Sequence, residues 1–151
     1  MTASTAAPPP AEEVIAELEE GFALFDDWED RYRYLMELGR ELEPLRAEEM
    51  VEANRVSGCQ SRVWLTTRAE GGRLHLRAGS DAAFVQGILA LLLRVYGGRP
   101  CAEIIATGPE FLGRLGLEEA LSMSRRNGAA AVVARIQQAA REAAGRGPGR
   151  G

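Results

Sequence analysis

The chain is poor in the residues that build cross-links and metal centres. It has two cysteines, one histidine and no lysine among its 151 residues. Two cysteines do not make a disulfide-rich secreted scaffold, and with one histidine they cannot fill a tetrahedral zinc site unless carboxylates join. They are also too few to hold an iron–sulfur cluster by cysteines alone. We therefore expect a cytoplasmic protein with reduced thiols and no resident metal.

Long apolar runs and an export signal are missing as well. The longest wholly apolar run, Ile88 to Leu93, is far too short to span a bilayer. The opening residues, "MTASTAAPPP", have neither the basic nor the apolar region of a secretory signal. The net charge of −4 argues against a nucleic-acid-binding protein. Neither a membrane nor a nucleic acid is expected as a partner.

Charge is unevenly distributed along the chain. Residues 1–53 hold fifteen acidic side chains and four arginines, whereas residues 54–151 hold seven acidic side chains and fourteen arginines. The second part of the chain is therefore the expected surface for an acidic partner.

Composition predicts one domain between two disordered tails. Residues 1–10 are rich in Ala, Pro and Thr, and residues 145–151 read "GRGPGRG", so neither segment can bury apolar surface. The domain is expected over residues 11–144, which is long enough for a substantial hydrophobic core.

The domain is expected to begin with two amphipathic helices. Apolar residues recur at helical spacing from Ala11 to Gly21. A second helix is expected to start at Asp26 or Asp27, either of which is a good N-cap, and to end before Pro44.

Beyond these helices the apolar period changes to alternation, which predicts strands. The runs 63–67 and 74–76 flank Glu70-Gly71-Gly72, whose flexible backbone suits the tight connection of a β-hairpin. Residues 54–57, just before the hairpin, are a candidate third strand.

The rest of the chain is expected to be helical. Ser80-Asp81 should cap a strongly apolar helix that ends at Gly97-Gly98 and forms the centre of the core. Further helices are expected over residues 102–106, over residues 110–115, and from "SMSRRNG" to about Ala144. This order predicts an α+β domain, with an antiparallel sheet of about three strands packed against helices.

Cys59 is the strongest candidate for chemistry. It lies between Gly58 and Gln60-Ser61, in a turn before strand pairing begins, whereas a structural cysteine normally lies on the apolar face of an element. Gly58 permits a positive-φ backbone and close approach by another molecule. The pattern leaves two interpretations open: a functional thiol, or a loop cysteine without a role.

His75 and Cys101 are weaker candidates. His75 would serve as a base for Cys59 if the two came together. Its mid-strand position, opposite the face used by Leu74 and Leu76, is more simply that of a solvated cross-strand residue. Cys101 follows Pro100 at a helix start, a position that can make a thiol reactive, but a first-turn residue without a chemical role is the preferred interpretation.

Four segments together point to a family: "DWEDRYRYLMELGRELEPL" (27–45), "NRVSGCQSRVWL" (54–65), "GSDAAFVQGILALLLRVYGGRP" (79–100) and "LSMSRRNG" (121–128). In this order they resemble the SufE sulfur-acceptor proteins, which partner cysteine desulfurases in iron–sulfur cluster assembly. The resemblance covers about residues 12–142, and its most specific part is Gly-Cys-Gln-Ser followed by Val-Trp. It implies a SufE/IscU-like fold.

The resemblance also implies a function for Cys59. In the family the matching cysteine accepts sulfur from the persulfide of the desulfurase, so Cys59 would become a persulfide by transpersulfidation. A SufS-type desulfurase, which carries its own PLP, would be the donor, and a SufBCD-like scaffold complex would receive the sulfur. No cofactor is implied on this chain, which would activate a desulfurase more than act as a stand-alone enzyme. Because a persulfide in water is lost to thiols and oxidants, the loop is expected to tuck Cys59 against the domain.

Neighbours of Cys59 enter through the same resemblance. Gln60 and Ser61, beside Gly58, are expected to shape the loop and to offer hydrogen bonds. Arg125 matches a family arginine at the desulfurase interface, with a solvated first-turn arginine as the alternative. Asp81 matches a family position near the cysteine loop and is a candidate for partner binding, although the helix-capping role is the simpler expectation.

Other functions stay open at this point. One is a small-substrate hydrolase that uses Cys59 and His75, and another is a non-catalytic adaptor in which Cys59 is incidental. A cluster scaffold of the IscU type normally needs three cysteine-type ligands, which the chain lacks.

Overall fold

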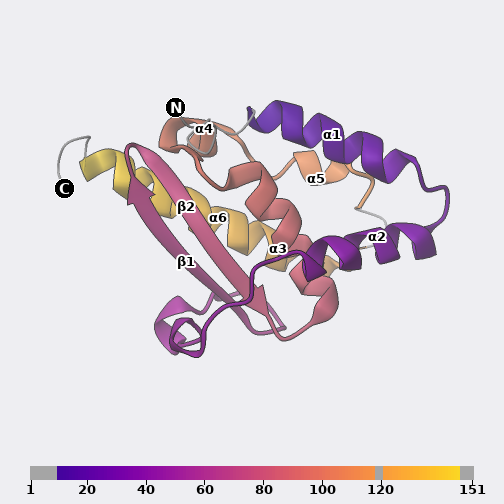
Figure 1. The fold of residues 1–151 in the computed structure, drawn as a ribbon, viewed down its shortest axis with the longest axis horizontal. Helices are drawn as coiled ribbons and strands as arrows, with labels where there is room; N and C mark the ends of the chain where they lie inside the picture. The colour runs from indigo at the N-terminus through magenta and orange to yellow at the C-terminus, as the bar shows by residue number, and fades with distance from the viewer. Residues whose placement is uncertain (1–9, 118–120, 147–151) are drawn as a thin grey trace, which may run out of the picture.

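The computed structural model describes residues 10–117 and 121–146, in which helices pack against one small sheet (Figure 1). The helices are α1 (Ala11–Ala23), α2 (Trp28–Arg40), α3 (Ala83–Tyr96), α4 (Cys101–Ala106), α5 (Phe111–Arg114) and α6 (Met123–Arg146). The strands are β1 (Val63–Glu70), β2 (Arg73–Ser80) and β3 (Arg99–Pro100), preceded by the 3₁₀ turns η2 (Ala47–Glu49) and η3 (Glu52–Asn54). The predicted α+β class, with a three-stranded antiparallel sheet, is confirmed.

The first two helices form where the sequence predicts. Asp27 is the N-cap of α2, because its carboxylate accepts a hydrogen bond from the backbone N–H of Asp30 over 2.9 Å. In α1 the buried side chains include Ile15, Leu18 and Phe22, the apolar face of an amphipathic helix.

Two glycines let α2 lie unusually close to α3. A Cβ built on Gly87 would lie 2.4 Å from the carbonyl oxygen of Leu35, and one built on Gly39 would lie 2.7 Å from the backbone nitrogen of Gly87. Any side chain at either position would therefore separate the helices. The close crossing brings Tyr32 of α2 onto Phe84 of α3, with ring centroids 4.6 Å apart.

The helix expected at the centre of the core is α3, in which Leu91, Leu92 and Val95 are completely buried. Its start corrects the sequence prediction, because the N-cap is Ala82 and not Ser80-Asp81. Ser80 is still paired in the sheet, opposite Val63, and its hydroxyl accepts the backbone N–H of Ala82 over 3.2 Å in the turn that follows.

The hairpin is confirmed, and its third strand is not where the sequence predicts. Gly71 and Gly72, with φ of 61° and 79°, make the two-residue turn between β1 and β2, which needs positive φ at both positions. Residues 54–57 form only an isolated bridge, because η3 shortens the extended run before it. The third strand is β3, which returns from α3 to pair with β2 near the hairpin turn.

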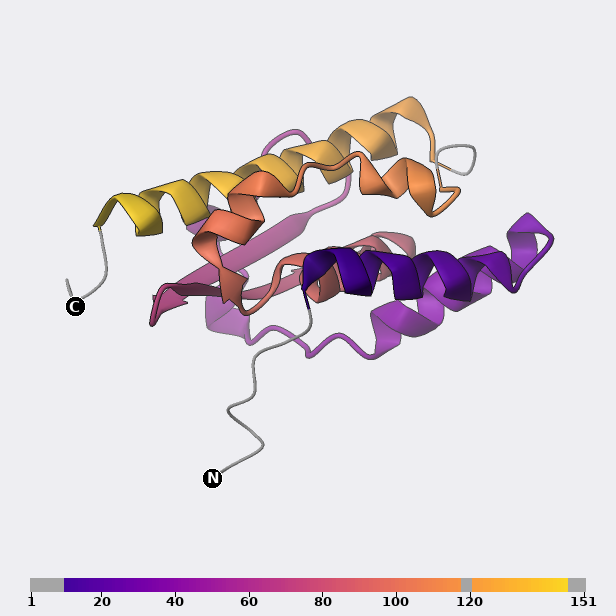
Figure 2. The same ribbon diagram turned by 90° about the horizontal axis from the view of Figure 1, so that it is seen from above.

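The layers place α6 along one side of the molecule and α1 with α2 along the opposite side (Figure 2). Helix α6 continues to Arg146, past the boundary expected at Ala144, and Pro10 precedes α1 as its N-cap residue. The remaining parts of the predicted tails, residues 1–9 and 147–151, lie outside the described residues.

Candidate functional site

Cys59 lies in a short loop, residues 57–62, whose two ends are held together. The backbone N–H of Val56 donates to the carbonyl oxygen of Val63 over 2.9 Å, and Arg55 forms a β-bridge with Trp64. Gly58 has φ of 92°, in the left-handed region that favours glycine, as predicted. The loop is thus closed at its base and attached directly to the start of β1.

The Cys59 thiol is tucked against the domain, as expected. Cys59 is half-buried, and its Sγ lies 3.6 Å from the carbonyl oxygen of Gly128 in α6, a distance that suits a weak S–H···O hydrogen bond. Burial raises the pKa of the Cys59 thiol, and the positive charge of Arg55 offsets part of this rise. The resting thiol is therefore protonated at neutral pH and a poor nucleophile.

Cys59 borders a cavity of about 100 Å³ between the loop, α3 and α6. Its lining is mostly apolar: Val63, Phe84, Val85, Ile88, Leu89, Ala129 and Val132, together with Gln60, Ser61, Arg125 and Gly128. An atom bonded to the Cys59 sulfur would lie in this small apolar cavity. It would therefore be in contact with little water.

Asp81 holds the end of the loop, which corrects its expected role as a helix cap. Its Oδ1 accepts the backbone N–H of Arg62 over 3.2 Å, and its Oδ2 lies 3.3 Å from Arg62 Nε. Helix α3 starts at Ala83 with Ala82 as N-cap, so the Asp81 carboxylate is used by the loop instead.

Arg125 lies at the first turn of α6 and also lines the cavity. Its backbone N–H donates to Ser122 Oγ over 3.2 Å, so Ser122 caps the helix. Its guanidinium Nη1 donates to the Tyr32 hydroxyl over 3.1 Å, and its Cζ lies 4.5 Å from the centre of the Phe84 ring. Arg125 is exposed but has specific contacts, unlike a merely solvated arginine.

Gln60 and Ser61 line the cavity without the hydrogen bonds expected of them. Gln60 is exposed and Ser61 is half-buried. In the part of the chain that the structure describes, neither side chain makes a hydrogen bond. The polar contacts of the loop come instead from Cys59 and Arg62.

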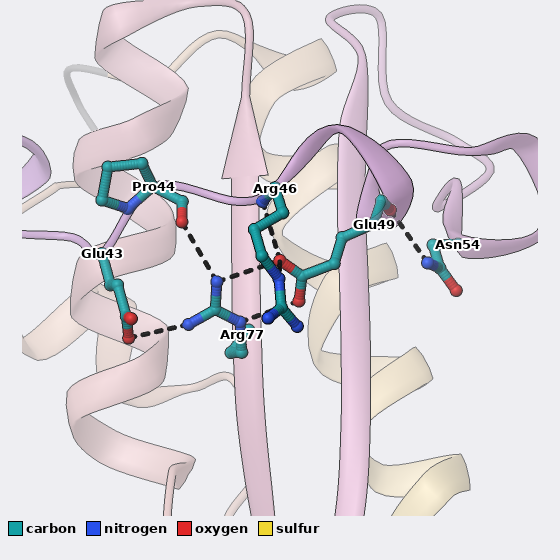
Figure 3. A network of polar contacts seen from close by, with 6 residues as sticks. All are labelled: Glu43, Pro44, Arg46, Glu49, Asn54 and Arg77. Carbon is teal, nitrogen blue, oxygen red and sulfur yellow. Dashed lines mark hydrogen bonds and ion pairs between the residues drawn. The ribbon is translucent and has the colours of Figure 1, made fainter.

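The segment leading into the loop is fixed on β2 by a charged network (Figure 3). Arg77 donates to the two carboxylate oxygens of Glu49 over 2.8 and 2.9 Å and pairs with Glu43 over 2.7 Å. Glu49 also accepts the backbone N–H of Arg46 over 2.8 Å, and its carbonyl accepts the Asn54 amide over 2.8 Å. The hydrogen bonds from Arg77 lower the pKa of Glu49 to about 2.

His75 is remote from Cys59. It pairs with Arg68 in the hairpin, and 39% of its side chain is exposed, which confirms the interpretation as a solvated cross-strand residue. Along β2 it is about 17 Å from Ser80, which pairs with the first residue after the Cys59 loop. The Cys59–His75 pair that a hydrolase of this type requires is therefore not formed.

Cys101 is part of the hydrophobic core at the start of α4, with 6% of its surface exposed. This burial agrees with the interpretation that it has no chemical role. Among the described residues, no three His, Cys, Asp or Glu side chains come together as a metal ion would need. Over the same residues, none of the helices has the length and apolarity needed to cross a membrane.

Gly128 and Tyr32 are site residues that the sequence did not single out. A Cβ on Gly128 would lie 3.5 Å from Cys59 Sγ, an ordinary contact distance, so α6 passes directly beside the thiol at a residue type that weakens a helix. An isolated glycine inside a helical segment was the available signal. Tyr32 gave no separate signal, because its spacing fitted the apolar face predicted for α2.

Comparison with known proteins finds matches over most of the chain. Residues 16–140 match the family model described as SufE: Fe-S metabolism associated domain. The chain is 42% identical over 125 residues to an uncharacterized SufE-like protein of Rhizobium etli, covering 80% of this chain and 84% of that protein. It is also 42% identical over 109 residues to the sulfur acceptor protein CsdE of Escherichia coli, covering 71% of this chain and 74% of that protein.

A solved structure has the same fold. The solution structure of a hypothetical protein from Thermus thermophilus matches with a TM-score of 0.73 and 25% identity, covering 93% of this chain and 99% of that one.

Proposed function

The chain belongs to the SufE family, and from this premise we propose that it accepts a persulfide sulfur from a cysteine desulfurase onto Cys59. Removal of the sulfur stimulates the desulfurase, and the chain delivers the sulfur for iron–sulfur cluster assembly. The observation that carries this proposal is the position of Cys59, in a closed loop and beside an apolar cavity. The similarity to a protein named as a sulfur acceptor supports it.

The transfer is a thiol–persulfide exchange. Cys59 loses its proton, and the thiolate attacks the terminal sulfur of the donor persulfide. The S–S bond of the donor breaks and its cysteine leaves as a thiolate, while the new S–S bond makes Cys59 the persulfide. No external oxidant or reductant is consumed. PLP belongs to the desulfurase, and the chain itself needs no cofactor for this step.

The loop serves two requirements of this chemistry in turn. In the tucked state the thiol is half-buried and its pKa is raised, which limits reaction with stray oxidants. To react, the loop leaves α6 and carries Cys59 to the donor, where loss of the apolar surroundings favours the thiolate. After transfer, return to the cavity shelters the persulfide.

The partners follow from the same proposal. A SufS-type desulfurase is the donor and a SufBCD-like scaffold complex is the recipient, both in the cytoplasm. Arg125 is exposed beside the cavity and meets the desulfurase, while Asp81 holds the loop through Arg62 until docking. The remote position of His75 disfavours a hydrolase. The experiment below distinguishes a sulfur carrier from a non-catalytic adaptor.

Mass spectrometry of the intact chain tests the proposal. After incubation with a purified SufS-type desulfurase and L-cysteine, the chain should gain one sulfur atom, located on Cys59 by peptide mapping and removed by a thiol reductant. Cys59→Ser should gain none and should not stimulate the desulfurase, whereas Cys101→Ala should behave like the wild type. A Cys59→Ser variant that stimulates the desulfurase normally would overturn the carrier mechanism and favour the adaptor.

A further inference from the structure

Arg125 differs from the other arginines near the Cys59 loop in how it is held. Arg62 pairs with Asp81 at 3.3 Å, and Arg55 lies 3.7 Å from a carboxylate oxygen of Glu52. Among the described residues, no carboxylate lies within ion-pair distance of Arg125, whose contacts are with the phenol of Tyr32 and the ring of Phe84. These contacts orient the guanidinium, and none of the carboxylates that the structure describes pairs with its charge.

We propose that Tyr32, Phe84 and Arg125 form a preformed carboxylate-binding site, here called the Tyr32 clamp, at the edge of the Cys59 cavity. Its ligand is an acidic side chain on the surface of the desulfurase, and Tyr32 is a positioning residue for Arg125. The clamp rests on the proposed function, because it specifies how the sulfur donor is recognised.

The hydrogen-bonding capacity of the clamp fits a carboxylate. A guanidinium has five N–H donors, and Arg125 uses one side-chain donor on Tyr32. The remaining donors include a fork that matches the two oxygens of a carboxylate. The Tyr32 oxygen accepts from Arg125, so Tyr32 acts on the carboxylate only through the guanidinium that it orients.

Three helices hold the clamp in place before any partner binds. The Tyr32 ring stacks on Phe84, with centroids 4.6 Å apart and an angle of 30° between the planes, and the Arg125 guanidinium lies over the same Phe84 ring. The close crossing of α2 and α3 at Gly39 and Gly87 fixes the two rings relative to each other. Much of the side-chain freedom of Arg125 is therefore lost before binding, which favours affinity.

The position of the clamp links recognition to the transfer step. Arg125 and Cys59 line the same cavity, so a carboxylate bound at Arg125 lies next to the place from which the thiol must leave. Arg125 also stands in the first turn of α6, where the helix dipole disfavours a cation. The contacts with Tyr32 and Phe84 keep the cation at this position despite that cost.

Tyr32→Phe is the sharpest test, because it removes the hydroxyl and keeps the ring on Phe84. We expect the Kd for a purified SufS-type desulfurase to rise about two- to tenfold, the range of one hydrogen bond. The desulfurase concentration that gives half-maximal sulfur transfer should rise by the same factor. The amount of sulfur bound per Cys59 at saturation and the melting temperature should not change. Tyr34→Phe is the matched control, because the Tyr34 ring packs on Phe22 and Phe25 instead.

A double-mutant cycle separates positioning from a simple loss of contact. Arg125→Ala should weaken binding more than Tyr32→Phe, and Tyr32→Phe should add nothing in the Arg125→Ala background. Arg126→Ala, which removes the neighbouring exposed arginine, should change the Kd less than Arg125→Ala. Independent, additive losses from Tyr32→Phe and Arg125→Ala would overturn the positioning role, as would a Tyr32→Phe variant that binds like the wild type.

Two further experiments test the Tyr32 clamp independently of the proposed function. In the free protein, side-chain NMR should show an ordered Arg125 guanidinium that becomes mobile in Tyr32→Phe, and a guanidinium equally mobile in both would overturn the clamp. A wild-type chain that binds the desulfurase through Arg125 but takes up no sulfur would overturn the proposed function and support the clamp.

Discussion

Cys59 and Gly128 lie 69 residues apart in the sequence, yet the Cys59 thiol is 3.6 Å from the Gly128 carbonyl oxygen. Helix α6 thereby forms the surface on which the loop rests. A Cβ at position 128 would already lie 3.5 Å from the sulfur and 3.9 Å from the Cys59 Cβ. A methyl group would therefore fit against the loop at this position of α6, and a larger side chain would push the loop away.

Gly128→Val should release the Cys59 loop, because the two methyl groups of valine extend beyond a Cβ that is already in contact with the sulfur. Alkylation of Cys59 by iodoacetamide near neutral pH should become faster, because exposure removes the burial that raises the thiol pKa and so increases the thiolate fraction. Gly145→Val is the control, since nothing lies within 4 Å of a Cβ there. Equal alkylation of the wild type and Gly128→Val would contradict the packing of the loop on α6.

The pH dependence of Cys59 reactivity should reveal its burial. Burial raises the pKa of the thiol, so the midpoint of its alkylation rate should lie at higher pH than in the urea-unfolded chain. Because the pKa of the Cys59 thiol is higher in the folded chain than in the unfolded one, the protonated thiol contributes to the free energy of unfolding. This contribution is complete below the unfolded pKa and is lost as pH rises through the folded pKa. Urea unfolding from neutral to alkaline pH should show this loss in the wild type and not in Cys59→Ala.

Glu49→Gln should destabilise the segment that leads into the loop, because it removes the ion pair with Arg77 and weakens the hydrogen bond to Arg46. The pKa of Glu49 is lowered to about 2, so its contribution to stability is present above the usual carboxyl pKa and is lost as pH falls from about 4.5 towards 2. In urea unfolding, the wild type should exceed Glu49→Gln in stability at neutral pH, and the gap should close in acid. Glu48→Gln, an exposed neighbour, should show no such gap.

Gly87→Ala should destabilise the whole domain. The added Cβ would lie 2.4 Å from the Leu35 carbonyl oxygen, so α2 and α3 must separate. We expect a loss of about 1–3 kcal/mol, typical of an overpacked core, measured by chemical unfolding. Gly145→Ala, with open space around it, should be neutral or slightly stabilising, and a similar loss in both variants would rule out the helix contact as the cause.

Local signals were sufficient for much of the fold and for the reactive residue. The Gly71-Gly72 turn, the Asp27 cap and the Gly58-Cys59 turn each depend on a few adjacent residues, and each is found as predicted. The short strand β3 has no periodicity to detect, because its pairing is created by the return of the chain from α3.

The wrong prediction for Asp81 and the missed contact of Tyr32 have a common physical reason. A carboxylate before a helix can bind the helix N–H groups or a neighbouring cation, and Asp81 binds Arg62 because the folded chain places that arginine beside it. Tyr32 meets Arg125 across 93 positions of sequence. Tertiary contacts decide which partner each side chain binds, and neither residue spacing nor helix propensity carries information about those contacts.

The hydrogen bond between Val56 and Val63 fixes how far the sulfur can travel. Cys59 is only three residues from Val56, and an extended chain covers at most about 3.6 Å per residue, so the Cys59 backbone reaches roughly 10 Å from that anchor. The Cys59 side chain adds only its own length to this reach. A donor sulfur buried further below the surface of the partner would be inaccessible unless the partner moved. The length of the loop therefore limits the partners to those whose reactive sulfur lies within this distance of their surface.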